Sequence, residues 1–296
     1  MNPVLKGYLR LTRPANLPTA AADVIAGIAI AGLFIEPDTF YVLINEVIAL
    51  VLASVCLYAG GVVLNDFFDY ELDVVERPER PIPSGLIKLK NAAILGGFLL
   101  FLGVFLAFFV NALCGFIALA LAIAILLYDK FAKHNAFLGP VNMGVCRGLN
   151  LLLGIAILGE LNHWYFSIIP ILYIAAITLI SRGEVHGDNK KHIILAGLLY
   201  AVVICAITGL FLSHDHNILP AIPFIILFAI MIYRPLIAAY KENSPQNIKK
   251  AVIAGVLSLI ILDASVAVGF SQWWLGIVVL LLLPLSMLLS RLFAVT

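Results

Sequence analysis

Long apolar stretches dominate this chain and recur along almost its whole length. Ten of them approach the roughly 20 residues that a helix needs to cross a bilayer. They lie near residues 17–35, 43–64, 91–110, 112–128, 136–158, 164–181, 193–213, 218–240, 250–268 and 273–292. All are too long for membrane strands, and most are uninterrupted rather than alternating. The sequence therefore predicts an all-α polytopic membrane protein, a bundle of nine to ten transmembrane helices.

The composition agrees with a lipid environment. Of 296 residues, 63% are hydrophobic and only 12% are charged, whereas soluble domains carry about 25% charged residues. A net charge of +1 provides no basic field for polyanions, so we expect membrane lipid around the chain and no nucleic-acid partner. The connections are short and contain no soluble insertion. We therefore expect a single transmembrane domain over residues 1–296.

Basic residues are concentrated in every second connection, and the intervening connections carry no Lys or Arg. The positive-inside rule places the basic connections, both chain termini and any site built on them at the cytoplasmic face. The residues concerned are Lys6, Arg10, Arg13, Arg77, Arg80, Lys88, Lys90, Lys130, Lys133, Arg182, Lys190, Lys191, Lys241, Lys249, Lys250 and Arg291.

An acidic segment follows directly on the second apolar stretch. At about 100° per residue, its polar side chains share one helical arc roughly 100° wide. Like charges at this spacing repel one another, and a divalent cation would relieve the repulsion. Carboxylate and amide oxygens suit Mg²⁺, although a solvated helix end is the simpler alternative. The predicted Mg²⁺ ligands here are Asn65, Asp66, Asp69 and Asp73, and Glu76 shares the arc.

A second acidic pair, Glu184 and Asp188, follows the sixth apolar stretch at the same expected face of the membrane. Two such sites can converge across a helical bundle and hold a cation-bridged diphosphate between them. We therefore predict that both residues are Mg²⁺ ligands, with a plain loop as the alternative.

Basic groups in the same connections are candidates for binding that diphosphate. Arg gives bidentate contacts to phosphate, and Lys acts as a point charge. Each residue alone would be an ordinary cytoplasmic charge, but their coincidence with the acidic segments favours a joint site. The predicted diphosphate-binding residues are Arg77, Arg80, Tyr128, Lys130 and Lys133.

These motifs carry a resemblance to a known family. Asn-x3-Asp-x3-Asp followed by Arg-Pro-Ile-Pro-Ser-Gly resembles the first signature of the UbiA superfamily of intramembrane prenyltransferases. Arg13-Pro14-Ala15-Asn16 and the loop after residue 128 are similar to that family too. The strings Ser-Arg-Gly-Glu-Val-His-Gly and Cys-Arg-Gly-Leu-Asn resemble its EboC-like branch.

The match has departures. Ser181 stands where the family often has Asp, and Ala132 occupies the Lys position of its Tyr-x3-Lys spacing. The family core has nine spans, whereas ten apolar stretches are present. These differences keep open a second reading, a catalytically altered prenyl-lipid-binding or transport protein of the same fold.

The resemblance implies Mg²⁺-dependent transfer of an isoprenoid chain from a prenyl diphosphate to an acceptor, either aromatic or another small polar molecule. The reaction would take place in a central cavity open to the cytoplasmic side. Asp69, Asp73 and Asp188 would be catalytic. A phosphatidyltransferase of the CDP-alcohol type would need Asp-Gly followed by Ala-Arg, a pattern that Asp66 and Asp69 do not begin.

Polar residues deeper in the apolar stretches are candidates for the acceptor pocket. An arginine at mid-depth costs roughly 2.5–3.5 kcal/mol on insertion scales, so Arg147 should face a polar cavity or a partner. Hydrogen bonding between helices is the alternative role for such residues. The predicted acceptor pocket consists of Asn16, Asp23, Asn142, Arg147 and Asn150.

Overall fold

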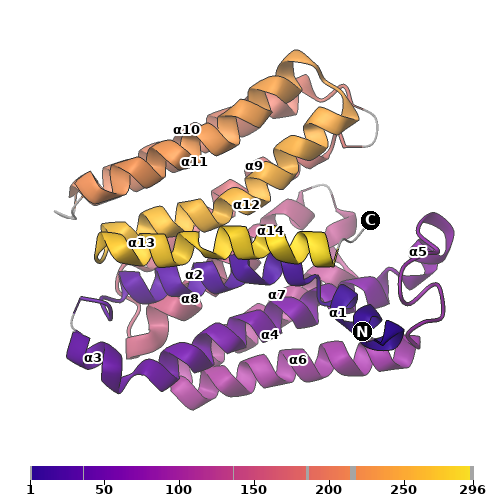
Figure 1. The fold of residues 1–296 in the computed structure, drawn as a ribbon, viewed down its shortest axis with the longest axis horizontal. Coiled ribbons are helices and arrows are strands. Elements are labelled where there is room, and N and C mark those ends of the chain that lie inside the picture. The colour runs from indigo at the N-terminus through magenta and orange to yellow at the C-terminus, as the bar shows by residue number, and fades with distance from the viewer. Residues whose placement is uncertain (1, 36, 136, 185–186, 214–217, 294–296) are drawn as a thin grey trace.

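The computed structural model describes residues 2–35, 37–135, 137–184, 187–213 and 218–293. Over these residues every regular element is a helix (Figure 1). The α-helices are α1 (Pro3–Leu11), α2 (Leu17–Ile30), α3 (Pro37–Val42), α4 (Ile44–Phe68), α5 (Tyr70–Glu76), α6 (Leu89–Val110), α7 (Ala112–Lys130), α8 (Leu138–Ile155), α9 (Ile168–Ser181), α10 (Lys190–Ser213), α11 (Ile218–Lys241), α12 (Pro245–Gly269), α13 (Trp273–Leu280) and α14 (Leu282–Leu292).

Nine helical segments of the described chain are long and apolar enough to cross a membrane. This confirms the all-α polytopic prediction. The first expected span is the exception, because its helical part, Pro14–Ile30, is shorter than the others. Gly32 has a left-handed φ of 86° just after it, a conformation that ends a helix and that glycine adopts without strain.

The helices α2, α8 and α12 form the interior of the bundle. Helix α2 contacts α4, α8 and α12, while α6 packs on α4, and α10 and α11 pair outside α12 (Figure 1). Helices α2 and α8 approach at backbone distance, since a Cβ atom on Gly27 would lie 2.3 Å from the Leu151 carbonyl oxygen. Small residues permit such contacts between membrane helices, and this one sets the polar residues of α2 and α8 against each other.

The outer helices carry large apolar side chains on their free faces. On α6, for example, Phe98, Phe101, Phe105 and Phe109 are each more than half exposed. A contiguous apolar surface of this kind is unfavourable in water and favourable in a bilayer. The exposure pattern therefore agrees with a multi-pass integral membrane protein.

Both ends of the described chain lie at one end of the bundle, together with α5 (Figure 1). Helix α10 begins at this end and reaches Ser213 at the opposite end. The connections that follow α4 and α9 therefore share one end of the molecule. This is the arrangement that the two acidic segments require if they are to cooperate.

Candidate functional site

The first acidic segment continues α4 as a nearly unbroken helical path. The Asp69 N–H donates to the Asn65 carbonyl at 3.0 Å, and the Asp73 N–H donates to the Asp69 carbonyl at 2.8 Å. Asp69 itself leaves the α conformation between α4 and α5. Asp66 and Asp73 are buried, whereas Glu76 is exposed. The four proposed Mg²⁺ ligands are therefore held along one short helical path, with Asp66 and Asp73 on one side and Asn65 and Asp69 on the other.

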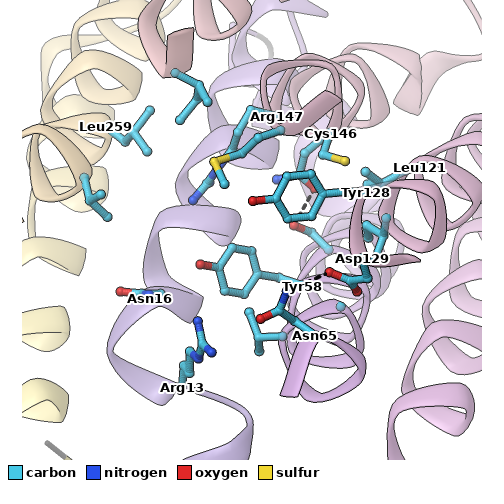
Figure 2. Close-up of a pocket in the computed structure, with 18 residues that line it drawn as sticks. Arg13, Asn16, Tyr58, Asn65, Leu121, Tyr128, Asp129, Cys146, Arg147 and Leu259 are labelled. Atoms are coloured by element: carbon cyan, nitrogen blue, oxygen red, sulfur yellow. Dashed lines mark hydrogen bonds between the residues drawn. The ribbon is translucent and has the colours of Figure 1, made fainter. Parts of the chain in front are cut away.

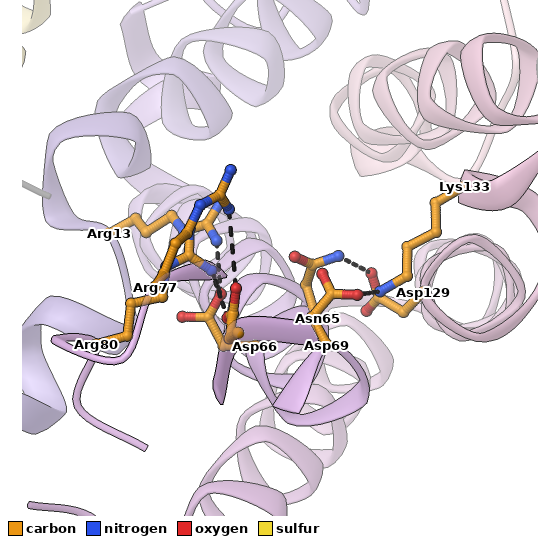
Figure 3. A network of polar contacts seen from close by, with 9 residues as sticks. Arg13, Asn65, Asp66, Asp69, Arg77, Arg80, Asp129 and Lys133 are labelled. Carbon is orange, nitrogen blue, oxygen red and sulfur yellow. Dashed lines mark hydrogen bonds and ion pairs between the residues drawn. The ribbon is translucent and has the colours of Figure 1, made fainter. Parts of the chain in front are cut away.

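Two arginines bind the buried acids of this path (Figure 3). Asp66 Oδ1 lies 2.6 Å from Arg13 Nη2 and 3.3 Å from Arg80 Nη1. Arg80 Nη1 also lies 2.6 Å from Asp73 Oδ2. Arg77 is 3.9 Å from Asp73, and half of its side chain is exposed. Arg80 therefore joins two acids of the segment, and Arg13 ties them to the chain before α2.

Two residues from the end of α7 bind the other side of the segment. Lys133 Nζ lies 2.5 Å from Asp69 Oδ1. Asn65 Nδ2 donates to Asp129 Oδ1 at 3.1 Å (Figure 3). Asp129 is buried and its second oxygen, Oδ2, has no hydrogen-bond partner among the described residues. The segment is thus held between the loop that carries Arg80 and the loop that follows α7.

These contacts bear on the expectation that a divalent cation relieves the repulsion among the acids of the first segment. Repulsion within the acidic arc does not need a divalent cation, because Arg13, Arg80 and Lys133 compensate the carboxylates directly. The Nε atoms of Arg13 and Arg80 are also buried, without a hydrogen-bond partner in the described chain. Unpaired buried donors are unfavourable, so both arginines retain a hydrogen-bonding site for an added anion.

A cavity of about 320 Å³ lies beside this segment (Figure 2). Its polar lining includes Arg13, Asn65, Asp129 and Tyr128. Its apolar lining comes from several helices: Leu121, Ile125, Ile174, Val256 and Leu259. The cavity therefore combines a charged region next to the acidic segment with an apolar wall, and it is a central cavity as the sequence predicted.

The deeper part of the cavity is lined by Arg147 and Asn150 of α8. Arg147 Nη1 lies 2.7 Å from Asp23 Oδ2, and Arg147 Nη2 donates to Thr19 Oγ1 at 2.6 Å. Asn150 Nδ2 donates to the same Asp23 oxygen at 2.9 Å. Arg147 thus has both the polar surroundings and the partner that its depth requires.

Other polar residues extend this deep network. Ser54 donates to Asn150 Oδ1 at 2.7 Å, and the Arg147 guanidinium lies 5.3 Å from the centre of the Tyr58 ring. Asp263 of α12 lies close enough to Asp23 for electrostatic interaction. Helix–helix hydrogen bonding and cavity lining, which the sequence left as alternatives, are therefore combined in the same residues.

Some predicted site residues lie elsewhere. Asn16 lines the cavity, but Asn142 is not in its lining and instead contacts Cys146 Sγ at 3.7 Å. Lys130 is exposed, with Nζ 5.1 Å from the centre of the Phe131 ring. One helical step of about 100° separates it from buried Asp129, which turns it away from the acidic segment. Its diphosphate contact therefore remains a prediction, and Lys133 is the lysine that contacts the acidic segment.

The second acidic segment is placed differently. Asp188 is exposed and Glu184 half-buried, and neither lines the cavity. Burial raises the pKa of Glu184, an effect that nearby Lys249 opposes. Val185 and His186, part of the second motif, lie outside the described residues. The Mg²⁺ role of Glu184 and Asp188 remains a prediction.

The donors nearest the cavity suit a hard cation without forming a ready-made site. Across the described residues, no group of three His, Cys, Asp or Glu side chains is arranged to hold a metal ion. Asn65 and Asp129 nevertheless present oxygens at the cavity, one of them a buried carboxylate oxygen without a partner. Hard oxygen donors of this kind match Mg²⁺, which often completes its shell with water and substrate phosphates. The residues present therefore fit Mg²⁺ binding together with a phosphorylated ligand.

Asp129, Tyr58, Ser54 and Thr19 were not singled out from the sequence. Asp129 had a detectable signal, since it is the first acidic residue after a long apolar helix and stands between Tyr128 and Lys130. The other three have polar side chains that are common in membrane helices. Only the packing of α2, α4 and α8 brings them beside Arg147 and Asn150.

Comparison with known proteins finds relatives that match part of this chain. A protein of Methanococcoides burtonii named digeranylgeranylglyceryl phosphate synthase is 40% identical over 157 residues, covering 52% of this chain and 56% of its own length. One of Saccharolobus solfataricus with the same name is 32% identical, covering 64% of this chain and 67% of its own length. The chain thus spans little more than half of the first of these relatives.

Solved structures share the fold. A structure of digeranylgeranylglyceryl phosphate synthase superposes with a TM-score of 0.68 at 24% identity, covering 90% of this chain and 98% of its own. A UbiA homologue from Archaeoglobus fulgidus bound to GPP and Mg²⁺ gives 0.67 at 16% identity, covering 88% and 99%.

The sequence profile of the UbiA prenyltransferase family matches residues 24–253, well over half of the chain. That range contains the first acidic segment, the α7 loop and the deep residues of α8. The chain therefore belongs to the UbiA prenyltransferase family.

Proposed function

We propose that this protein transfers an isoprenoid chain from a prenyl diphosphate to an acceptor within the membrane. The observation that carries the proposal is the pair of buried Nε donors on Arg13 and Arg80, which have no partner among the described residues. Of the two, Arg13 lines the largely apolar cavity. An anionic head with an apolar tail complements both features. The whole chain 1–296 acts as one domain in this proposal, and the end that carries the acidic segments faces the cytoplasm because the basic connections are there.

The diphosphate would bind beside the first acidic segment. Arg80 and Arg13 can each donate through Nε without giving up their carboxylate contacts. Lys133 adds a third cation. Arg77 follows α5, and Tyr128 lies in the last turn of α7. Charge-assisted hydrogen bonds from such groups stabilise a phosphate more strongly than neutral ones. Negative charge that develops as the diphosphate leaves is therefore stabilised by groups already in place.

Asn65, Asp66, Asp69 and Asp73 would hold Mg²⁺, with Glu184 and Asp188 contributing from the second segment. Bound Mg²⁺ would neutralise the departing diphosphate. The Archaeoglobus fulgidus UbiA homologue was solved with Mg²⁺ and GPP and with Mg²⁺ and DMAPP, which supports the same chemical class here. Asp69, Asp73 and Asp188 are the proposed catalytic carboxylates.

The reaction breaks the bond between the allylic carbon and the diphosphate oxygen, and the oxygen keeps the electron pair. The acceptor forms the new bond to that carbon with its own electron pair and loses a proton. Water would compete with the acceptor for the electrophilic carbon. Leu121, Ile125 and Leu259 line the cavity with apolar groups and so favour the prenyl chain over water.

The deep polar residues would receive the acceptor. Asn16, Arg147 and Asn150 line the cavity, and Asp23 fixes both Arg147 and Asn150. A small polar acceptor with a hydroxyl group fits hydrogen-bonding groups of this kind. The relatives' name supports a prenylated glyceryl phosphate among the acceptors to be tested, and Asn142 is assigned to this pocket from the sequence alone.

One observation favours a second function, prenyl-lipid binding without turnover. The carboxylates of the first segment are already compensated by arginine and lysine, and the second pair does not line the cavity. A protein built this way could bind a prenyl diphosphate and leave it intact.

A turnover assay separates the two functions. The protein in nanodiscs is incubated with Mg²⁺, geranyl or geranylgeranyl diphosphate, and either geranylgeranylglyceryl phosphate or an aromatic acid. Release of diphosphate together with a prenylated product is expected for one acceptor and should stop when Mg²⁺ is chelated. Tight binding of the diphosphate with no product from any pair would support the binding protein instead.

A further inference from the structure

Asp129 is buried in the wall of the proposed site. Its side chain is 3% exposed and comes from the last turn of α7, a different helix from that of Asn65. Figures 2 and 3 show the two side chains meeting beside the cavity. A charged group at this depth is unfavourable unless it has a partner or a ligand.

The contact between them fixes the orientation of an amide. Asn65 Nδ2 lies 3.1 Å from Asp129 Oδ1. Asp129 Oδ1 accepts this hydrogen bond, so Asn65 turns its NH₂ group toward Asp129. Asn65 Oδ1 is left on the other side, where it accepts no hydrogen bond from the described residues. An amide bound to a cation must present that oxygen, because only the oxygen can act as a hard ligand.

We propose that Asp129 is a positioning residue for cation binding, one that holds Asn65 with its carbonyl oxygen toward the metal. The inference rests on the proposed function, since it assumes a cation at the first acidic segment. The partner of a metal ligand commonly sets the ligand's orientation, and its loss weakens metal binding about 10- to 100-fold. Asp129 would act in this way from α7 on a ligand carried by α4.

The test measures cation binding rather than turnover. Mn²⁺, as a substitute for Mg²⁺, is titrated by electron paramagnetic resonance into the protein in nanodiscs with geranyl S-thiolodiphosphate present. We expect Asp129→Leu to weaken Mn²⁺ binding about tenfold. Asp129→Asn, which can still offer an oxygen to Asn65, should lose about threefold or less. Glu71→Gln, at an exposed acid of α5, is the matched control and should bind as the wild type.

A second background distinguishes positioning from a structural role. In Asn65→Asp the side chain has two oxygens, so its orientation no longer matters. Adding Asp129→Leu to the Asn65→Asp variant should therefore weaken Mn²⁺ binding by less than about twofold. The double variant Asn65→Asp/Asp129→Asn restores a hydrogen bond in which residue 129 is the donor, and it should also bind Mn²⁺.

Two results would overturn the inference: wild-type affinity in Asp129→Leu, or an equal tenfold loss when Asp129→Leu is placed in the Asn65→Asp background. Absence of binding by the wild type would instead contradict the proposed function and the inference with it. Melting temperatures of every variant in nanodiscs identify any that fails to fold. If Asp129→Leu fails, the smaller Asp129→Ala replaces it with the same expected tenfold loss.

Discussion

The two acidic segments lie at the same end of the bundle but are built into it to different degrees. The first is tied to three other parts of the chain through Arg13, Arg80 and Lys133. The second carries half-buried Glu184 and exposed Asp188, and among the described contacts neither has an ion pair within salt-bridge distance. Acidic residues at similar spacing can thus be part of the packed structure in one place and remain open to a ligand in another.

The difference has an energetic consequence. Replacing an acid of the first segment removes the partner of a buried cation, so folding and substrate binding should both suffer. Replacing an acid of the second segment removes no such partner, so any effect should be confined to ligand binding and turnover.

Asp73→Asn should have the largest effect. It weakens an ion pair with Arg80, whose side chain is only 12% exposed, and it removes a proposed Mg²⁺ ligand. Turnover should fall at least about 100-fold, the range seen when a charge-stabilising group is lost. Because a charged hydrogen bond is lost, the free energy of unfolding should also fall by about 2 kcal/mol. Product formation and denaturant unfolding are the two measurements.

Asp188→Asn is the matched change in the second segment. Turnover should fall about tenfold if Asp188 contributes to Mg²⁺ binding, while the free energy of unfolding should stay within about 0.5 kcal/mol of the wild type. Equal destabilisation by both variants would contradict the comparison. Unchanged turnover in Asp188→Asn would remove Asp188 from the proposed catalytic set.

Lys133→Met should have an intermediate effect. It leaves Asp69 without its 2.5 Å partner and removes a cation from the proposed diphosphate site. Loss of a charge-assisted contact worth about 1.5–3 kcal/mol should raise the KM for the prenyl diphosphate about tenfold or more. Lys130→Met is the comparison variant. Because Lys130 is exposed, its KM should rise less than that of Lys133→Met. Similar KM values for the two variants would show that the α7 loop does not bind the diphosphate through Lys133.

Glu184→Gln should have the smallest effect, and its sign depends on pH. Burial raises the pKa of Glu184 in the folded state, so the folded protein holds this proton more tightly than the unfolded chain does. Stability contributed by the protonated group is therefore lost as pH rises through the folded-state pKa. Because the group is only half-buried, Glu184→Gln should raise the melting temperature slightly at pH 7 and have no effect near pH 4. A lower melting temperature at pH 7 would show that the charged carboxylate stabilises the fold.

The sequence predicted the features that follow from local pattern. Apolar length marked the spanning helices, and helical periodicity placed Asn65, Asp66, Asp69 and Asp73 on one arc. The depth of Arg147 in an apolar stretch predicted a buried partner, which proved to be Asp23. Such features depend on residues close in sequence or on the cost of burying charge.

Features that depend on loop conformation were not predictable in the same way. Lys130 and Lys133 look equivalent in sequence, yet the turn after α7 points one outward and the other to Asp69. Two features depend on contacts between residues 14 to 64 positions apart in the sequence. They are the burial of the Nε donors of Arg13 and Arg80 and the hydrogen bond from Asn65 to Asp129. The local periodicity of the sequence does not predict contacts between residues so far apart in the chain.

The central claim is that the first acidic segment forms the ligand site beside the cavity. A crystal structure with Mn²⁺ and geranyl S-thiolodiphosphate, with the metal located by its anomalous scattering, tests it most directly. We expect a Mn²⁺ peak at the oxygens of Asn65 and Asp69, with the thiolodiphosphate near Arg13 and Arg80 and the prenyl chain along Leu121 and Ile125. A metal bound only at Glu184 and Asp188, away from the cavity, would contradict it.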